Sequence, residues 1–301
     1  MTKILYIAGY GRSGSTVLNI VLGNHSDIVG VGEVSLLLND WIAPDHVCAC
    51  GKPYDKCEFW SSLFQSPPSA KLVQSVRKIE KLSFVPCLLL GLIREDNRQV
   101  YRAYQEMLFD HIASSTGKSI IIDSSKSARY IAGRPLALKK LAGENVYVLH
   151  LVRNGINTVE SLAVKGSNWA IEGLTENRKW QGIRAVLGWT IANIWASAMG
   201  RLLDADHYML LRYEDFIAHP AATLMRIGDF CGFDAKELVE RVNRDDCFKV
   251  GHLVGGNRVR LRREIRIQKS REQDQGKRLK LYHRLLFVIV ARWLSRYYGY
   301  K

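Results

Sequence analysis

The chain alternates short, continuous apolar runs with longer stretches in which apolar residues recur at helical spacing. Continuous apolar runs of this length are typical of strands that are covered on both faces in a parallel sheet. We predict four such strands at residues 4–8, 119–122, 146–152 and 208–211. Residues 28–31 are a candidate for a short fifth strand.

Helical patterns fill the intervals between these runs. We predict helices at residues 16–24, 99–115, 157–164, 184–203 and 221–231. This alternation predicts an α/β fold, with helices flanking a central parallel sheet in a single domain over residues 1–301. Residues from about 40 to 97 lack strand signals, so we expect a helical and loop insertion that caps the sheet and shapes a substrate pocket.

Composition and charge narrow the class of partner. The chain is 47% hydrophobic and 24% charged, which is ordinary for a folded domain and argues against wholesale disorder. Its net charge is +14, and residues 258–301 hold 14 Lys and Arg against 3 Asp and Glu. This balance favours anionic partners, although many of these side chains would also suit a solvated helical surface. We expect residues from about 255 to 301 to form a basic cap over the site, with a charged loop or frayed helix at 258–276.

No leader peptide or membrane span is apparent in the sequence. The chain enters the first strand at once, without a charged segment followed by an apolar core and a cleavage site. The apolar stretch 84–93 is short and contains Pro86, and the stretch 285–294 is interrupted by Arg292. We expect both to be buried helices and the protein to be cytoplasmic, with weak membrane contact through the basic C-terminal segment as an option.

A glycine-rich turn, Gly-Tyr-Gly-Arg-Ser-Gly-Ser-Thr at residues 9–16, follows the first strand directly. Gly9, Gly14 and Thr16 have the spacing of a phosphate-binding P-loop, but Ser15 stands where the P-loop lysine belongs. A positive charge comes earlier, at Arg12. Backbone N–H groups and a helix N-terminus still suit an anion, so the turn predicts a phosphate-like ligand other than ATP.

Polar side chains follow the other predicted strands as well. Asp-Ser-Ser-Lys-Ser occupies 123–127, Arg153-Asn154-Gly155 follows the third strand with Ser161 in the next helix, and Arg-Tyr-Glu-Asp occupies 212–215. In open parallel sheets, ligands bind at the carboxyl ends of the strands. These groups would therefore converge on one edge and suit a nucleotide with two separate phosphate ends.

These motifs together resemble the sulfotransferases that use 3′-phosphoadenosine 5′-phosphosulfate (PAPS). Residues 11–16 resemble the 5′-phosphosulfate loop, closest to the Pro-Arg-Ser-Gly-Thr-Thr form of protein-tyrosine sulfotransferases. Residues 151–161 resemble the 3′-phosphate segment, with Arg and Ser at the family's separation. Residues 212–220, the late loop Gly-Gly-Asn-Arg at 255–258 and Tyr-Gly-Tyr at 298–300 add to a set that spans most of the chain.

The resemblance implies a role for each matching residue. The residues that would wrap the 5′-phosphosulfate are Arg12, Ser13, Gly14, Ser15 and Thr16. Arg153 and Ser161 would hold the 3′-phosphate, with Lys165 adding to that contact, because a guanidinium binds phosphate oxygens in pairs. Tyr213 and Arg258 would contact the adenosine and the 3′-phosphate, and Asn257 would bind the nucleotide from the late loop.

The implied reaction moves a sulfuryl group to a hydroxyl of a glycan, a lipid or a small metabolite. Glu33 would be the base, as in the related carbohydrate and tyrosine sulfotransferases, with His252 as the alternative. Lys126 and Arg12 would neutralise the charge that grows on the leaving phosphate. We expect no metal requirement and no specific nucleic acid partner. Each of these side chains also has a structural interpretation, as a solvated charge, an ion-pair partner or an ordinary helix residue.

Two rival functions remain open at this point. A P-loop kinase or NTPase would use Asp123, at the end of the second predicted strand, to hold magnesium, but the missing lysine argues against it. A nucleic acid binder would use the basic C-terminal segment, which lacks regular aromatic interleaving and any recognisable motif.

Three cysteines, Cys48, Cys50 and Cys57, lie close together in the sequence. They would suit zinc if a fourth ligand came from His46 or from a distant part of the chain. A disulfide is the second option, although a reducing compartment disfavours it. We favour simple packing of the loop over either alternative.

Overall fold

The structure is a computed structural model, and it describes residues 2–41, 43, 46–128, 130–165, 180–267 and 276–301. A five-stranded parallel sheet forms its centre, with the strands in the order β2-β3-β1-β4-β5. The strands are β1 (Lys3–Ala8), β2 (Ile28–Gly32), β3 (Ile120–Asp123), β4 (Asn145–Val152) and β5 (Tyr208–Arg212). All four predicted strands and the candidate fifth strand are confirmed.

Five helices match the predicted ones within a few residues. They are α1 (Ser15–Leu22), α5 (Glu95–Thr116), α7 (Gly155–Lys165), α9 (Gln181–Leu202) and α11 (Pro220–Cys231). The helix at 221–231 ends where expected, because Gly232 adopts a left-handed conformation that closes it. The prediction of an α/β fold with flanking helices is therefore confirmed.

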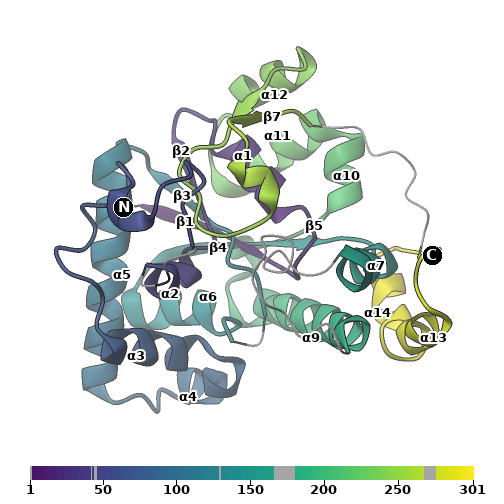
Figure 1. The fold of residues 1–301 in the computed structure, drawn as a ribbon, viewed down its shortest axis with the longest axis horizontal. Coiled ribbons are helices and arrows are strands. Elements are labelled where there is room, and N and C mark those ends of the chain that lie inside the picture. The colour runs from purple at the N-terminus through teal and green to yellow at the C-terminus, as the bar shows by residue number, and fades with distance from the viewer. Residues whose placement is uncertain (1, 42, 44–45, 129, 166–179, 268–275) are drawn as a thin grey trace.

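Helices cover both faces of the sheet. In Figure 1, α1 and α11 lie above the sheet with α12 (Lys236–Asn243), while α9 lies below it with α3 (Ala70–Glu80) and α6 (Arg134–Ala137). The strands between them are almost wholly buried, as in β1, where residues 4–8 are at most 1% exposed. Two-sided burial explains why these strands read as continuous apolar runs.

The segment from about 40 to 97 contains short helices, as expected. After α2 (Leu37–Asp40) it forms α3 and α4 (Val85–Leu90), which lie together at the lower left of Figure 1. Its helices pack on α5 and α6. None of its described residues lines the main cavity discussed below, so the structure gives no support to the expectation that it shapes the substrate pocket.

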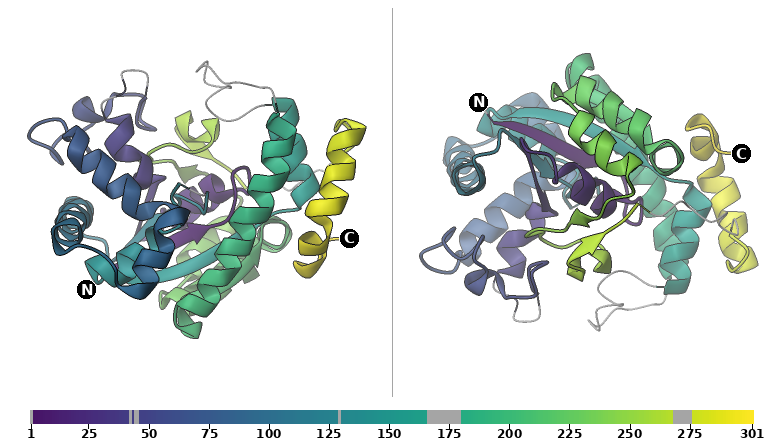
Figure 2. Two further views of the ribbon diagram at one scale, coloured as in Figure 1. Left: turned by 90° about the horizontal axis from the view of Figure 1, so that it is seen from below. Right: turned by 90° about the horizontal axis from the view of Figure 1, so that it is seen from above.

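The C-terminal region, from β6 onward, consists of a small two-stranded sheet with its loop, followed by two helices. A two-stranded antiparallel sheet, β6 (Phe248–Lys249) and β7 (Glu264–Ile265), frames a loop with one 3₁₀ turn (Arg258–Leu261) that lies against α1. Residues 258–267 are loop with short elements, in line with the loop expected at 258–276, and residues 268–275 of that prediction lie outside the described residues. Beyond this loop, α13 (Leu281–Val290) packs against α9, and α14 (Arg292–Tyr297) packs against α13. Both helices, coloured yellow, lie at one side of the molecule in Figure 2.

The expectation that residues 84–93 and 285–294 form buried helices is wrong in part. Both are helical, but Leu90 is 71% exposed and Ile289 is 76% exposed. Each helix lies at the rim of the fold and buries only one face against its neighbours. None of the helices in the described part of the chain combines the length and the hydrophobicity that a membrane span requires.

Candidate active site

The glycine-rich turn leaves β1 at the point where the strand order reverses, beside β4. Gly9 has φ +124°, and a Cβ there would lie 2.4 Å from the carbonyl oxygen of Leu151. Gly14 has φ +89° and lies against Tyr213, where a Cβ would come within 2.2 Å of the ring. Both positions therefore require glycine, and the turn delivers the N-terminus of α1 to the crevice where α/β proteins bind ligands.

Two of the predicted site residues hold unusual backbone conformations. Arg12 has φ +66° and Lys126 has φ +72°, in the left-handed region that residues with a Cβ rarely occupy. Such conformations persist where the surrounding structure fixes them, and they are concentrated at functional sites. Ser13 helps to fix the turn, because its Oγ donates to the carbonyl oxygen of Tyr10 at 2.6 Å.

A cavity of about 1010 Å³ opens in front of this turn. Among the described residues that line it are six cationic side chains and one carboxylate, that of Glu160. The cationic ones are Arg12, Lys126, Arg153, Arg258, Arg262 and Arg278. Ten of the predicted site residues lie along its wall: Arg12, Gly14, Ser15, Thr16, Lys126, Arg153, Ser161, Tyr213, Asn257 and Arg258. A concave site with this excess of positive charge is suited to a polyanion.

Arg153 connects the glycine-rich turn to the next strand end. Its Nη1 donates to the carbonyl oxygen of Arg12 at 2.9 Å, and its guanidinium lies over the ring of Tyr213 at 4.9 Å from the centroid. Burial lowers the pKa of Arg12, and the charge of Arg153 lowers it further. Two guanidinium groups held this close repel each other, so an anion between them would relieve the repulsion.

Glu33 forms an ion pair with Lys126, which lines the cavity. Neither Glu33 nor Ser13 is among the described residues that line it. Glu33 follows β2 and Lys126 follows β3, and the Lys126 Nζ contacts Glu33 Oε1 directly. The two side chains are only 15% and 12% exposed. Tyr6 supports the pair, because its hydroxyl donates to the carbonyl oxygen of Lys126. The predicted base and the predicted leaving-group cation are therefore neighbours.

The late glycine loop, residues 255–258, lies against the start of α1. Val254 pairs with the end of β2, accepting a hydrogen bond from the Glu33 N–H at 2.7 Å. Three residues on, the Asn257 N–H donates to Thr16 Oγ1 at 3.1 Å. The loop therefore contacts both the base candidate and the start of α1.

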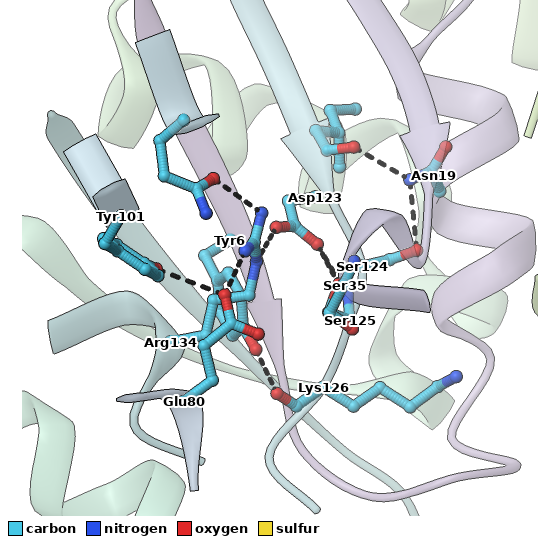
Figure 3. A network of polar contacts seen from close by, with 12 residues as sticks. Tyr6, Asn19, Ser35, Glu80, Tyr101, Asp123, Ser124, Ser125, Lys126 and Arg134 are labelled. Atoms are coloured by element: carbon cyan, nitrogen blue, oxygen red, sulfur yellow. Dashed lines mark hydrogen bonds and ion pairs between the residues drawn. The ribbon is translucent and has the colours of Figure 1, made fainter. Parts of the chain in front are cut away.

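Asp123, the magnesium candidate of the kinase hypothesis, is fully buried and already engaged. Its carboxylate accepts hydrogen bonds from Arg134 Nε at 2.7 Å and from the Ser125 N–H at 2.9 Å. Arg134 also pairs with Glu80, which accepts a hydrogen bond from the hydroxyl of Tyr101. Figure 3 shows this buried network, with the Lys126 side chain extending away from it. An aspartate committed to arginine in the core is not placed to hold a metal–nucleotide complex.

Glu214 is a site residue whose role the sequence did not reveal. Its Oε1 accepts a hydrogen bond from the Asn154 N–H at 3.1 Å, and its Oε2 accepts one from the Tyr300 hydroxyl at 2.6 Å. The carboxylate thus holds the loop that carries Arg153 and ties it to the C-terminus. The motifs at 212–216 and 298–300 meet here, although they lie far apart in the sequence.

A model of the sulfotransferase family matches residues 59–237, more than half of the chain. The chain belongs to the sulfotransferase family. The matched region includes Lys126, Arg153 and Tyr213, whereas the glycine-rich turn and the late loop lie outside it. Membership in this family supports the conclusion that the protein is a transferase that moves a sulfuryl group.

The sulfotransferase is also similar to solved structures of low sequence identity. One is the sulfotransferase domain of the Synechococcus PCC 7002 olefin synthase, at 21% identity over 79% of this chain and 76% of that chain, with a TM-score of 0.47. Another is the sulfotransferase STF1 of Mycobacterium tuberculosis H37Rv, at 17% identity over 80% and 71%, also with a TM-score of 0.47. These similarities assign no residue role in this chain. A search among curated proteins found no match.

Three residues that the sequence analysis named for the site or for a metal are not found in those roles in the described structure. His252, the alternative base, does not line the cationic cavity, and its ring lies against Cys48 and Cys57. His46, the candidate fourth ligand for the cysteines, pairs instead with Asp40 at 2.6 Å. The Lys165 side chain, at the end of α7, lies outside the described residues.

Proposed function

We propose that this sulfotransferase transfers the sulfuryl group of PAPS to a hydroxyl acceptor. The observation that carries the proposal is the cationic cavity at the glycine-rich turn, which suits a ligand with several negative charges. At one end, residues 12–16 and the N-terminus of α1 offer backbone N–H groups and the Arg12 side chain, which would hold the 5′-phosphosulfate.

Recognition of the 3′-phosphate would fall to Arg153 and Ser161. Both line the same cavity, one at the end of β4 and the other on α7. Arg153 is held in place by the Arg12 carbonyl and the Tyr213 ring, so little side-chain entropy would be lost when it binds. A second anion site distinct from the glycine-rich turn is what separates this donor from ATP.

Glu33 would accept the proton of the acceptor hydroxyl. The acceptor oxygen would form its bond to sulfur as the bond from sulfur to the 5′-phosphate oxygen breaks. In the structure Lys126 neutralises Glu33. When an anionic donor fills the cavity, Lys126 would turn toward the leaving phosphate together with Arg12, and Glu33 would become available as the base.

The acceptor class follows less directly from the cavity. Arg262 and Arg278 line it in addition to the cations assigned to the donor. Their charge supports an acceptor that is itself anionic, and a hydroxyl on a glycan, a lipid or a small metabolite would fit.

The test is formation of 3′,5′-ADP from PAPS in magnesium-free buffer, with a panel of hydroxyl acceptors and a labelled donor. The proposal predicts release that depends on the acceptor, with label in the acceptor product. Turnover of ATP that requires magnesium, with no 3′,5′-ADP formed from PAPS, would overturn it in favour of a kinase.

A further inference from the structure

Four side chains that commonly bind metal meet outside the cationic cavity. The loop at 48–57 brings Cys48, Cys50 and Cys57 together with His252, a residue nearly 200 positions away. The three Sγ atoms and one imidazole nitrogen all lie within 4.8 Å of one another. The sequence suggested three ligands, and the fold supplies the fourth.

The spacing of these atoms suits a tetrahedral ion. The Sγ atoms of Cys50 and Cys57 are 3.6 Å apart, and His252 Nδ1 lies 3.3 Å from Cys57 Sγ and 3.8 Å from Cys48 Sγ. Zinc bonds of about 2.3 Å to sulfur and about 2.0 Å to nitrogen place tetrahedral ligands roughly 3.5–3.8 Å apart. A disulfide needs two sulfurs at about 2.05 Å, would leave the third thiol and the histidine without a role, and is not formed by any of these cysteines.

The surrounding structure holds these ligands in place. Cys48 sits at a tight turn, where its N–H donates to Lys52 O at 2.9 Å and its carbonyl accepts from Gly51 at 2.8 Å. Trp60 is fully buried, and its indole N–H donates to the His252 carbonyl at 2.9 Å. Phe59 stacks on the His252 ring at a centroid distance of 5.4 Å. Outer contacts of this kind orient ligands at metal sites.

We propose that Cys48, Cys50, Cys57 and His252 form a structural zinc site. Three thiolates and one imidazole are a soft donor set that favours zinc over calcium or magnesium, and four protein ligands complete its tetrahedral shell. Binding would displace the thiol protons to solvent.

The position of the site gives it a role beyond the stability of its own loop. His252 opens the segment that reaches Asn257, and Leu253 accepts a hydrogen bond from the Ala49 N–H at 3.0 Å. Val254 then pairs with Glu33, and Asn257 with Thr16. Zinc would therefore anchor the late loop over the glycine-rich turn. This consequence rests on the proposed function, whereas metal binding itself does not.

The test is metal analysis of the full chain, purified without chelators from zinc-supplemented medium. We expect about one zinc per chain, and cobalt added to the metal-free protein should give thiolate charge-transfer bands and tetrahedral d–d bands. Cys50→Ser, at an exposed ligand, should weaken zinc binding at least about tenfold and lower the melting temperature. Cys87→Ser, outside the cluster, should leave both unchanged.

A second pair of variants addresses the fourth ligand. His252→Gln should lower zinc affinity, while His46→Gln should not, because His46 pairs with Asp40. Metal-free protein that gives no cobalt bands, or a Cys50–Cys57 disulfide found by mass spectrometry, would overturn the proposal. Loss of zinc with a raised KM for PAPS would support the loop-anchoring role. Loss of zinc with an unchanged KM would refute that role and leave the metal site standing.

Discussion

Two groups of charged side chains meet near the end of β3. One group is buried in the core, and the other lines the cavity. Asp123, Arg134 and Glu80 form a closed group, in which each charge meets an opposite one and no side chain is more than 2% exposed. Arg12, Lys126 and Arg153 belong to an open group, where cations outnumber carboxylates along a cavity wall. The same charged residue types thus build a buried network in one case and line a cavity in the other.

The balance of charge within each group explains the difference. Burial raises the pKa of Glu80, and Arg134 opposes that effect, so the closed group depends on its own pairing. Among the described residues that line the cavity, cations outnumber carboxylates, although Glu33 pairs with Lys126. This excess charge is a cost to the empty protein that an anionic ligand would offset.

The largest effect should come from breaking the closed group. Arg134→Met would leave Asp123 and Glu80 buried without their cation, and we expect a loss of about 3–5 kcal/mol in the free energy of unfolding. The loss should shrink as the pH falls, because protonated carboxyls no longer need the cation. Denaturant unfolding at several pH values measures this, and a loss below about 1 kcal/mol would show that the network is not structural.

Removing the proposed base, Glu33, tests the open group through Lys126, its ion-pair partner. Glu33→Gln should lower turnover at least about tenfold without weakening the binding of 3′,5′-ADP, because the variant loses the proposed base and also releases Lys126 from its ion pair. Steady-state kinetics and calorimetry give the two quantities. Glu106→Gln, on the exposed face of α5, is the matched control and should behave as the wild type. Unchanged turnover in Glu33→Gln would contradict the assignment.

Replacing arginine with methionine should destabilise the fold at Arg134, whereas at Arg153 it should mainly weaken nucleotide binding. If Arg153 binds the 3′-phosphate as proposed, Arg153→Met would lose charge-assisted hydrogen bonds to it, so 3′,5′-ADP should bind about 10- to 100-fold more weakly. Binding of 5′-AMP should weaken less, by no more than the loss of the hydrogen bond from Arg153 to the Arg12 carbonyl causes, and the free energy of unfolding should fall by less than in Arg134→Met. If both nucleotides lose affinity equally, Arg153 does not recognise the 3′-phosphate.

The smallest expected difference between the two groups is their response to salt. Raising ionic strength from about 0.05 M to about 0.5 M should weaken 3′,5′-ADP binding severalfold, because the cavity is open to ions. The buried group is screened far less, so unfolding near neutral pH should respond weakly. A stability loss that parallels the affinity loss would mean that the groups are not separate.

Local patterns were enough to predict the sheet and most of the cavity wall. Each strand, its following turn and the residues after it are contiguous in sequence, so periodicity and spacing locate Arg12, Lys126 and Arg153. Contacts between side chains from elements far apart in the sequence were not predictable. Asp123 looked like a magnesium ligand because nothing in the sequence shows that Arg134 and Glu80 enclose it. His252 likewise joins the cysteines only through the path of the chain in space.

The most direct test of the central claim is calorimetric titration of the wild-type protein with 3′,5′-ADP and with 5′-AMP, in buffer without magnesium. A cavity with separate cationic sites for two phosphate ends should prefer the bisphosphate by at least about tenfold. Equal affinities, or binding that appears only with magnesium, would contradict the account.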